Sequence, residues 1–343
     1  MNVDNTAREE PAFRWGVELT PEMPVGAVTD LAELTESNGF DAVFVSNHYN
    51  NRDPFVALSR IAGATDSIRL GPGVANPYET HPVKLAAQMG TLHEASGKRA
   101  VFGVGAGDPS TLSNMGIDRD RPLGTVRETV QVARRLWAGE RVTHDGTFTA
   151  VDAALNYEPG PIPAYVGAQG PQMLRMTAKH ADGVLFNGSH PRDYEWARER
   201  IETGLADRPA SAGEFTIAGF ASVSIAADGA KAKRAARPPV SYIVAGAPDA
   251  VLDRHDLDVT TAEAIGTAIE SGNRDRAYDL VTPEMIDAFS IAGDPNEVEE
   301  EIRGLFDTVD AVVAASPLGP DREDAISLLG DVRESILTKV ESR

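Results

Sequence analysis

Short apolar runs alternate along the chain with longer segments whose apolar residues recur every three or four positions. The short runs are typical of buried β-strands, and the longer segments are typical of amphipathic helices. Repetition of this alternation predicts an α/β fold of βα units, and eight parallel strands close into a (β/α)8 TIM barrel. The strands are predicted at residues 14–19, 42–46, 69–74, 100–105, 164–166, 183–186, 216–224 and 311–315.

The segments between the strands carry signals for helix ends and for one turn. Gly39 stands where a helix would stop, and Pro54 and Pro82 stand where the first turn of a helix would begin. Asp145-Gly146, between two alternating runs, predicts a β-hairpin inserted before the fifth strand. Helices are predicted at residues 25–38, 55–65, 83–94 and 125–137, and after the seventh strand at 231–245, 261–271, 285–291 and 295–308.

A long segment, at about residues 226–310, separates the seventh strand from the eighth. Because a strand returns after it, we predict a helical insertion on one barrel domain, residues 13–343, rather than a second domain. Residues 1–12 are polar and lack the basic start and apolar centre of a signal peptide, so a disordered tail is predicted there. No apolar run reaches the roughly 18 residues that a membrane-spanning helix requires.

Composition excludes several kinds of chemistry. The chain has no cysteine, which rules out disulfides, thiolate metal sites and cysteine nucleophiles. Asp and Glu total 52 against 32 Lys and Arg, and without a basic stripe nucleic acid is not an expected partner. An acidic surface along the whole chain favours a halophilic, cytoplasmic protein, because concentrated salt screens its self-repulsion. An ordinary acidic enzyme is the alternative.

Residues that end the first, second and fourth strands could carry chemistry, since active sites of such barrels lie at the carboxyl ends of the strands. Glu18 is an acid inside the first strand, and burial would require a partner, either in the site or as a salt bridge to an arginine. Asn47-His48 begin a polar loop, where a lone histidine is more often structural than catalytic. Asp108 follows alternating glycines at 103, 105 and 107, whose spacing is not that of a dinucleotide loop; we expect them to make room for a flat ring.

Other strand ends suggest a ligand with an anionic group. Gly73 ends the third strand, where glycine permits a bulge or close approach of a ligand. Residues 167–171 lead into a helix whose free N–H groups would bind an anion. The chain has no serine-hydrolase elbow, zinc-binding helix or phosphate-binding loop, and its histidines lack the spacing of metal ligands, so no metal centre is expected. Glu18 and Asp108 could also be the carboxyl pair of a glycosidase.

Six segments, taken in order, resemble the methylenetetrahydromethanopterin reductases of the bacterial luciferase-like superfamily. The resemblance extends from about residue 13 to residue 330, and Gly-Pro-Gly-Val-Ala-Asn-Pro-Tyr at 71–78 is its most specific part. The other segments are residues 16–18, 48–51, 103–108, 167–174 and 316–321.

The resemblance implies a TIM barrel that binds coenzyme F420, a deazaflavin that carries hydride. It implies a cis peptide bond between Gly73 and Val74 behind the deazaflavin ring, and a site for the cofactor phosphate near residues 167–171. The family usually has aspartate where this chain has Asn47. The implied cofactor-binding residues are Asn47, His48, Gly73, Val74, Asn76, Gly105, Ala106, Gly107, Gly167, Ala168, Gln169, Gly170 and Asn187.

The implied reaction moves hydride from the reduced deazaflavin to the methylene carbon of a tetrahydropterin and gives the methyl-tetrahydropterin. We expect Glu18 to donate the proton that opens the methylene bridge and Asp108 to stabilise the resulting cation, although these roles could be exchanged. The pterin is of the tetrahydromethanopterin or the tetrahydrofolate type. From their places in the sequence alone, Arg175 and Lys84 are expected to help bind an anionic cofactor tail, and a homo-oligomer is expected.

Three other functions are compatible with parts of the pattern. An FMN-dependent monooxygenase of the same superfamily would bind FMN in preference to the deazaflavin. A non-catalytic protein would bind deazaflavin without turnover. A glycoside hydrolase would need aromatic platforms for sugars, and the chain has few tryptophans, three in all.

The charge pattern generates a first prediction. With a formal net charge of −20, the protein is expected to melt at a higher temperature as KCl is raised towards about 1 M, where the Debye length falls to about 3 Å. Thermal unfolding across a KCl series measures this. Greatest stability at low salt would contradict the halophilic interpretation.

Overall fold

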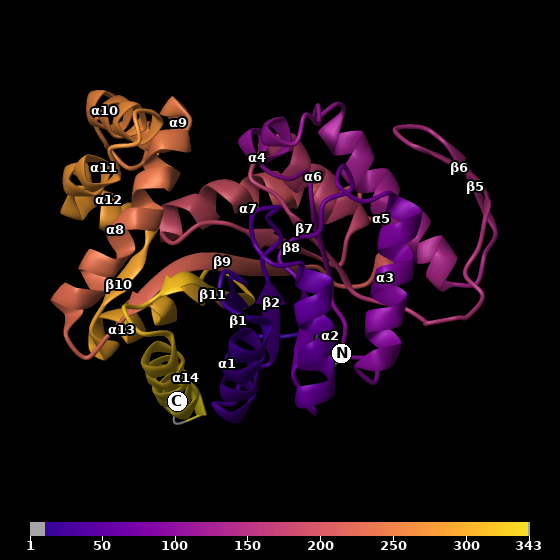
Figure 1. Cartoon of the computed structure of the whole chain (residues 1–343), viewed down its shortest axis with the longest axis horizontal. Coiled ribbons are helices and arrows are strands. Elements are labelled where there is room, and N and C mark those ends of the chain that lie inside the picture. Colours follow the sequence, from indigo (N-terminus) through magenta and orange to yellow (C-terminus); the bar gives the residue numbers. More distant parts are fainter. Residues whose placement is uncertain (1–10, 342–343) are drawn as a thin grey trace, which may run out of the picture.

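The computed structural model describes residues 11–341, so the predicted tail at 1–12 lies almost wholly outside the described residues. All eight predicted strands form, and they pair in parallel in the order β3-β2-β1-β11-β9-β8-β7-β4, which confirms the predicted barrel (Figure 1). The strands are β1 (Trp15–Leu19), β2 (Ala42–Val45), β3 (Arg69–Pro72), β4 (Phe102–Gly105), β7 (Ala164–Gly167), β8 (Gly183–Phe186), β9 (Thr216–Ile225) and β11 (Ala311–Leu318).

The barrel closes at the seam between β3 and β4. The N–H of Val101 donates to the carbonyl of Leu70 at 2.9 Å, and further bridges continue along the seam. Two glycines allow this approach. A Cβ atom on Gly71 would lie 2.0 Å from the carbonyl oxygen of Val101, and one on Gly103 would lie 2.0 Å from that of Pro72. Any side chain at either position would push the strands apart, because real Cβ atoms do not come this close to backbone oxygen.

Alternate strand residues point into the barrel, where four aromatic rings form a column. The ring of Tyr165 lies 5.1 Å from that of Phe13, and Phe13 lies 5.3 Å from Phe44. Phe44 in turn lies 6.1 Å from Phe220. The interior is therefore filled by packed side chains rather than open as a channel.

Eight helices surround the barrel and bury an apolar face against its outer side (Figure 1). The helices predicted at 25–38, 55–65, 83–94 and 125–137 all form, and Pro54 and Pro82 begin two of them as expected. The eight are α1 (Val25–Ser37), α2 (Pro54–Ala64), α3 (Pro82–Ala95), α5 (Pro122–Trp137), α6 (Pro171–His180), α7 (Pro191–Leu205), α13 (Pro295–Leu305) and α14 (Arg322–Glu341). No helix within residues 11–341 is long and apolar enough to cross a membrane.

A bundle of further helices follows β9 and has an apolar cluster of its own, lying at one end of the molecule (Figure 1). Its elements are α8 (Gly229–Gly246), α9 (Asp249–Arg254), α10 (Val259–Glu270), α11 (Arg274–Leu280), α12 (Pro283–Phe289) and the short strand β10 (Ile291–Gly293). The prediction of helix through residue 291 was wrong. Ile291 instead pairs with Val223 of β9, so the chain rejoins the sheet directly after α12.

A buried ion cluster ties this bundle to the barrel. Asp193, at the start of α7, accepts hydrogen bonds from Arg254 at 2.5 Å and faces His255 at 3.0 Å. Burial would raise the pKa of Asp193, but the hydrogen bonds from His255 and Arg254 outweigh it and hold the carboxyl ionised. Removing one partner of such a pair is costly, because the other charge is left buried.

The predicted hairpin forms as β5 (Val142–Asp145) and β6 (Thr149–Ala153), and Glu128 of α5 fastens it. One carboxylate oxygen of Glu128 accepts hydrogen bonds from the N–H and hydroxyl of Thr147, both at 2.7 Å, and lies 3.1 Å from Nε2 of His144. Burial alone would raise the pKa of Glu128, but these bonds lower it from 4.5 to about 2.

Glu128→Gln is expected to lower the free energy of unfolding by about 2 kcal/mol near neutral pH, because hydrogen bonds to a carboxylate are lost. A carboxyl with a lowered pKa stabilises the fold above its ordinary value of 4.5 and loses that contribution as the pH falls towards 2. Urea unfolding of variant and wild type should therefore differ at about pH 7 and converge only at about pH 2 or below. Glu263→Gln, on the exposed face of α10, is the matched control and should change neither. An equal difference at both pH values would contradict the assignment.

Candidate active site

A cavity of about 620 Å³ opens at the carboxyl ends of the barrel strands. This is the end at which barrels of this class carry their active sites. The floor is apolar and includes Leu185 and Phe220, the latter being the last ring of the aromatic column. Every residue predicted to bind the cofactor lines this cavity: Asn47, His48, Gly73, Val74, Asn76, Gly105, Ala106, Gly107, Gly167, Ala168, Gln169, Gly170 and Asn187.

The peptide bond between Gly73 and Val74 is cis, as the resemblance implied. Val74 then lies over the ends of β4 and β7. A Cβ atom on Gly105 would lie 2.6 Å from the side chain of Val74, and one on Gly167 would lie 3.3 Å from it. These glycines make room for Val74, so the expectation that the glycines of the fourth strand clear space directly for a flat ring was wrong for Gly105.

Gly107 also makes room for a protein side chain. Its φ is +71°, and a Cβ atom there would lie 2.0 Å from Nδ2 of Asn76. Asn76 is buried, and its Oδ1 accepts a hydrogen bond from the N–H of Tyr78 at 2.8 Å. The glycine thus lets a fixed amide group stand at the cavity wall.

Amide side chains supply several of the polar groups at the edge of the cavity. Gln169 donates to the carbonyl of Asn187 at 2.9 Å, which leaves the Gln169 carbonyl available. Asn47 donates from Nδ2 to Glu79 at 3.1 Å. His48 is exposed at the rim. A set of donors and acceptors in fixed positions suits the edge of a planar heterocycle.

Asp108 lines the cavity and also begins the short helix α4 (Pro109–Asn114), which the sequence did not predict. Its carboxylate accepts hydrogen bonds from the hydroxyl of Ser110 at 2.5 Å and from the N–H of Thr111 at 2.9 Å. Burial would raise the pKa of Asp108, but these bonds outweigh it and lower the pKa. Asp108 is therefore a permanent negative charge facing the cavity near neutral pH.

Glu18 does not line this cavity. It is only 4% exposed and borders a small separate space between the ends of β1 and β11. Its carboxylate accepts hydrogen bonds from the hydroxyl of Thr20 and from the N–H of Ser316, both at 3.1 Å. No ion pair to Glu18 is found within residues 11–341, so the salt bridge considered as an alternative is absent there. The expectation that Glu18 and Asp108 share one pocket was wrong, because the strand end of β1 is occupied by its hydrogen bonds to β11.

The positive groups of the site differ from those expected. Neither Arg175 nor Lys84 lines the cavity; Arg119, from the loop before α5, does so and donates to the carbonyl of Gly107 at 2.9 Å. The start of α6 also borders the cavity at Gly170. No side chain caps this helix start, so the anion site predicted there stays a prediction that its uncapped N–H groups would suit.

Two charged lining residues, Glu79 and Arg119, were missed in the sequence. Glu79 directly follows the segment that carried the resemblance, three residues after Asn76, so its place near the site could have been inferred. Arg119 belongs to a loop with no recognisable pattern. Among the described residues, no cluster of three or more His, Asp or Glu side chains could hold a metal ion.

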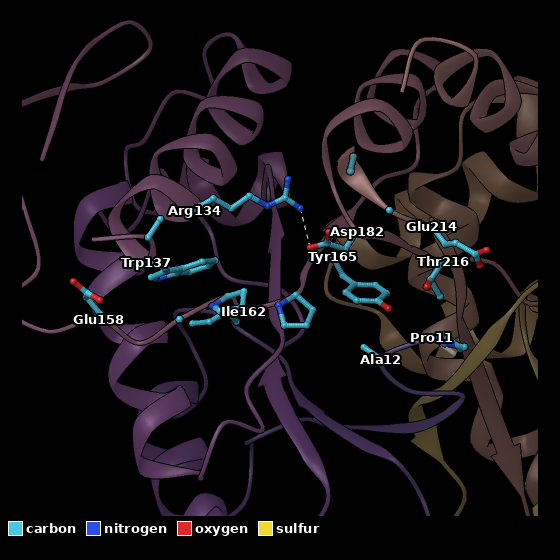
Figure 2. Close-up of a pocket in the computed structure, with 16 residues that line it drawn as sticks. Pro11, Ala12, Arg134, Trp137, Glu158, Ile162, Tyr165, Asp182, Glu214 and Thr216 are labelled. Carbon is cyan, nitrogen blue, oxygen red and sulfur yellow. Dashed lines mark ion pairs between the residues drawn. The ribbon is translucent and has the colours of Figure 1, made fainter. Parts of the chain in front are cut away.

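A second cavity, of about 820 Å³, lies at the opposite end of the barrel, at the amino ends of β7, β8 and β9 (Figure 2). Arg134 and Asp182 form an ion pair of 2.8 Å in its wall, and Tyr165 borders it. Because Tyr165 begins the aromatic column and Phe220 ends it, packed rings separate the two cavities.

Comparison with known proteins agrees with the barrel fold and with a cavity at the strand ends. A family model described as luciferase-like monooxygenase matches residues 11–311, and the chain belongs to this family.

Within that family the chain is similar to one group of reductases. It is 44% identical over 324 residues to the 5,10-methylenetetrahydromethanopterin reductase of Archaeoglobus fulgidus, covering 93% of this chain and 98% of that protein. It is 42% identical to the corresponding enzyme of Methanolobus tindarius, covering 92% and 98%. The structure of the coenzyme F420 dependent tetrahydromethanopterin reductase from Methanopyrus kandleri superposes with a TM-score of 0.88 at 37% identity, covering 94% of this chain and 98% of that one. The resemblance inferred from the strand ends is confirmed.

Gly107→Ala is expected to destabilise the protein more than Gly116→Ala. Both glycines have a φ of +71°, so both alanines bear a similar cost, about 1–2 kcal/mol, for left-handed backbone. Only the alanine at 107 would also collide with Asn76, since nothing lies within 4 Å of a Cβ atom at 116. Urea unfolding of the two variants measures the difference. Equal losses would show that Gly107 is not needed to seat Asn76.

Proposed function

We propose that the chain is a coenzyme F420-dependent 5,10-methylenetetrahydropterin reductase, with a substrate of the tetrahydromethanopterin or tetrahydrofolate type. The observation that supports this most is the cavity at the strand ends, lined by every residue that the resemblance implied for the cofactor. The similarity to reductases over nearly their whole length supports the same reaction.

The residues of the cavity fit a deazaflavin. The bulge at Gly73–Val74 and the side chains of Leu185 and Phe220 form an apolar bed for a flat ring. Amide groups stand at its edge, and the uncapped start of α6 suits the phosphate of the cofactor. When bound, the reduced deazaflavin supplies a hydride to the methylene carbon of the pterin.

The chain's own residues then have two tasks. Hydride transfer needs the methylene bridge opened by a proton on one pterin nitrogen, and the cation formed needs a nearby negative charge. Asp108 suits the second task, because its lowered pKa keeps it ionised at the cavity wall. Glu18 stays a predicted proton donor, but its hydrogen bonds to Thr20 and Ser316 would have to break for it to reach the cavity.

Purified protein at high KCl is expected to oxidise reduced coenzyme F420 in the presence of a methylene-tetrahydropterin, followed by loss of the reduced-cofactor absorbance. Methylene-tetrahydromethanopterin and methylene-tetrahydrofolate, assayed side by side, identify the pterin. Asp108→Asn should reduce turnover by about 100-fold, since stabilisation of developing charge typically contributes that much. The exposed Asp249, on α9, provides the matched control as Asp249→Asn.

Two outcomes would contradict the proposed reaction, and a third would change only the role of Asp108. Binding of FMN in preference to the deazaflavin would favour a monooxygenase. Binding of the deazaflavin without turnover of either pterin would favour a non-catalytic protein. Wild-type turnover in Asp108→Asn would remove Asp108 from the mechanism but leave the reaction in place.

A further inference from the structure

Arg119 is a cation at the active-site cavity whose charge has no partner among the described residues. Its side chain is exposed, and it forms no ion pair within residues 11–341. Of the described residues that line the cavity it is the sole lysine or arginine, whereas Glu79 and Asp108 contribute two carboxyl groups. The chain as a whole has a formal net charge of −20. An anionic ligand that enters this cavity therefore meets one arginine in an otherwise acidic surrounding, and charge complementarity favours a contact with it.

Two hydrogen bonds hold the segment that carries Arg119 at the cavity. Nη1 of Arg119 donates to the carbonyl oxygen of Gly107 at 2.9 Å, which uses one of the five N–H groups of the guanidinium. The carbonyl oxygen of the next residue, Asp120, accepts from the hydroxyl of Tyr78 at 2.5 Å. The protein thus orients the guanidinium through a single N–H group and leaves other donors for a ligand.

The pairing of two strands places this cation beside the start of α6. β4 and β7 pair in parallel, with Gly105 opposite Gly167. The chain continues from β4 to Gly107 and from β7 to Gly170, at the uncapped start of α6, so the two segments leave neighbouring strands at the same end of the barrel. Both glycines line the same cavity. A ligand that extends from the Gly73–Val74 bulge towards α6 therefore passes the segment on which Arg119 is held.

We propose that Arg119 binds the anionic side chain of coenzyme F420, an assignment that rests on the proposed reductase function. In this cofactor the ring bears a ribityl chain, then a phosphate, then carboxylates. A guanidinium can bind either anion through two parallel N–H···O bonds. The apolar bed at Gly73–Val74 contacts the ring, whatever chain the ring carries. Arg119 is therefore the residue that distinguishes the complete cofactor from an uncharged deazaflavin.

The test compares three ligands that share the ring and differ in charge. They are the deazaflavin with its ribityl chain alone, the same molecule phosphorylated, and coenzyme F420, each titrated into the cofactor-free protein by fluorescence. Arg119→Gln is expected to weaken coenzyme F420 binding by about 10- to 100-fold, as for loss of a hydrogen bond between charged groups, and to leave the uncharged ligand within about twofold. A loss already seen with the phosphorylated ligand identifies the phosphate as the partner. A loss confined to coenzyme F420 identifies the carboxylates.

Further variants and salt separate a contact with the ligand from a structural role. Arg119→Lys keeps the charge without the planar fork and should recover part of the affinity. Added KCl should narrow the difference between wild type and Arg119→Gln, because salt screens an exposed charge. Arg234→Gln, exposed on α8, is the matched control and should bind all three ligands as the wild type does. At saturating coenzyme F420, Arg119→Gln should keep the wild-type kcat and the wild-type KM for the methylene-tetrahydropterin.

Several results would overturn the proposal. Wild-type affinity of Arg119→Gln for coenzyme F420 would do so, as would an equal loss with the uncharged ligand, since Arg119 would then hold the loop instead of the cofactor. A raised KM for the pterin with unchanged affinity for coenzyme F420 would assign the cation to the other substrate. A wild type that binds none of the three ligands refutes the proposed function itself. A wild type that binds all three equally keeps the deazaflavin site and refutes only the role of Arg119.

Discussion

The close contact between β3 and β4 is the constraint on which the remaining structure depends. Gly71 and Gly103 bring the two backbones together where any larger residue would meet a carbonyl oxygen. Directly after this contact the chain forms the Gly73–Val74 bulge, and the side chain of Val74 lies against Gly105. The loop beyond then places Asn76 and Glu79 at the cavity wall. A local steric requirement of the barrel thus determines the shape of the site and the position of one of its acids.

The two carboxyl groups of the cavity have different surroundings because different elements present them. Asp108 stands at the start of a helix, where hydroxyl and N–H groups converge on it and favour its charge. Glu79 stands in a loop and meets amide groups, while burial favours its neutral form. Both occupy one cavity, yet their protonation at a given pH is expected to differ. Glu18, the third acid considered, lies outside this cavity and accepts a hydrogen bond from the backbone N–H of Ser316.

Periodicity was enough to predict the barrel, because strands and helices with strong amphipathic patterns fold much as their sequences suggest. It failed at Ile291, where an apolar residue with helical spacing joins β9 through long-range pairing. The residues that the family resemblance implied for the cofactor line one cavity, since the strand ends of a barrel converge. The position of Glu18 could not be derived, because it depends on hydrogen bonds to Ser316, 298 residues away in the chain. The role of Gly105 and Gly107 could not be derived for a similar reason. The side chains for which they make room, Val74 and Asn76, follow a different strand, β3.

The rings of Tyr165, Phe13, Phe44 and Phe220, in tilted and edge-to-face contact, run through the barrel from one cavity to the other. A shift of one ring would have to be accommodated by its neighbours, because closely packed interiors transmit strain. The filled interior therefore couples the two ends of the barrel mechanically, although their cavities are separate.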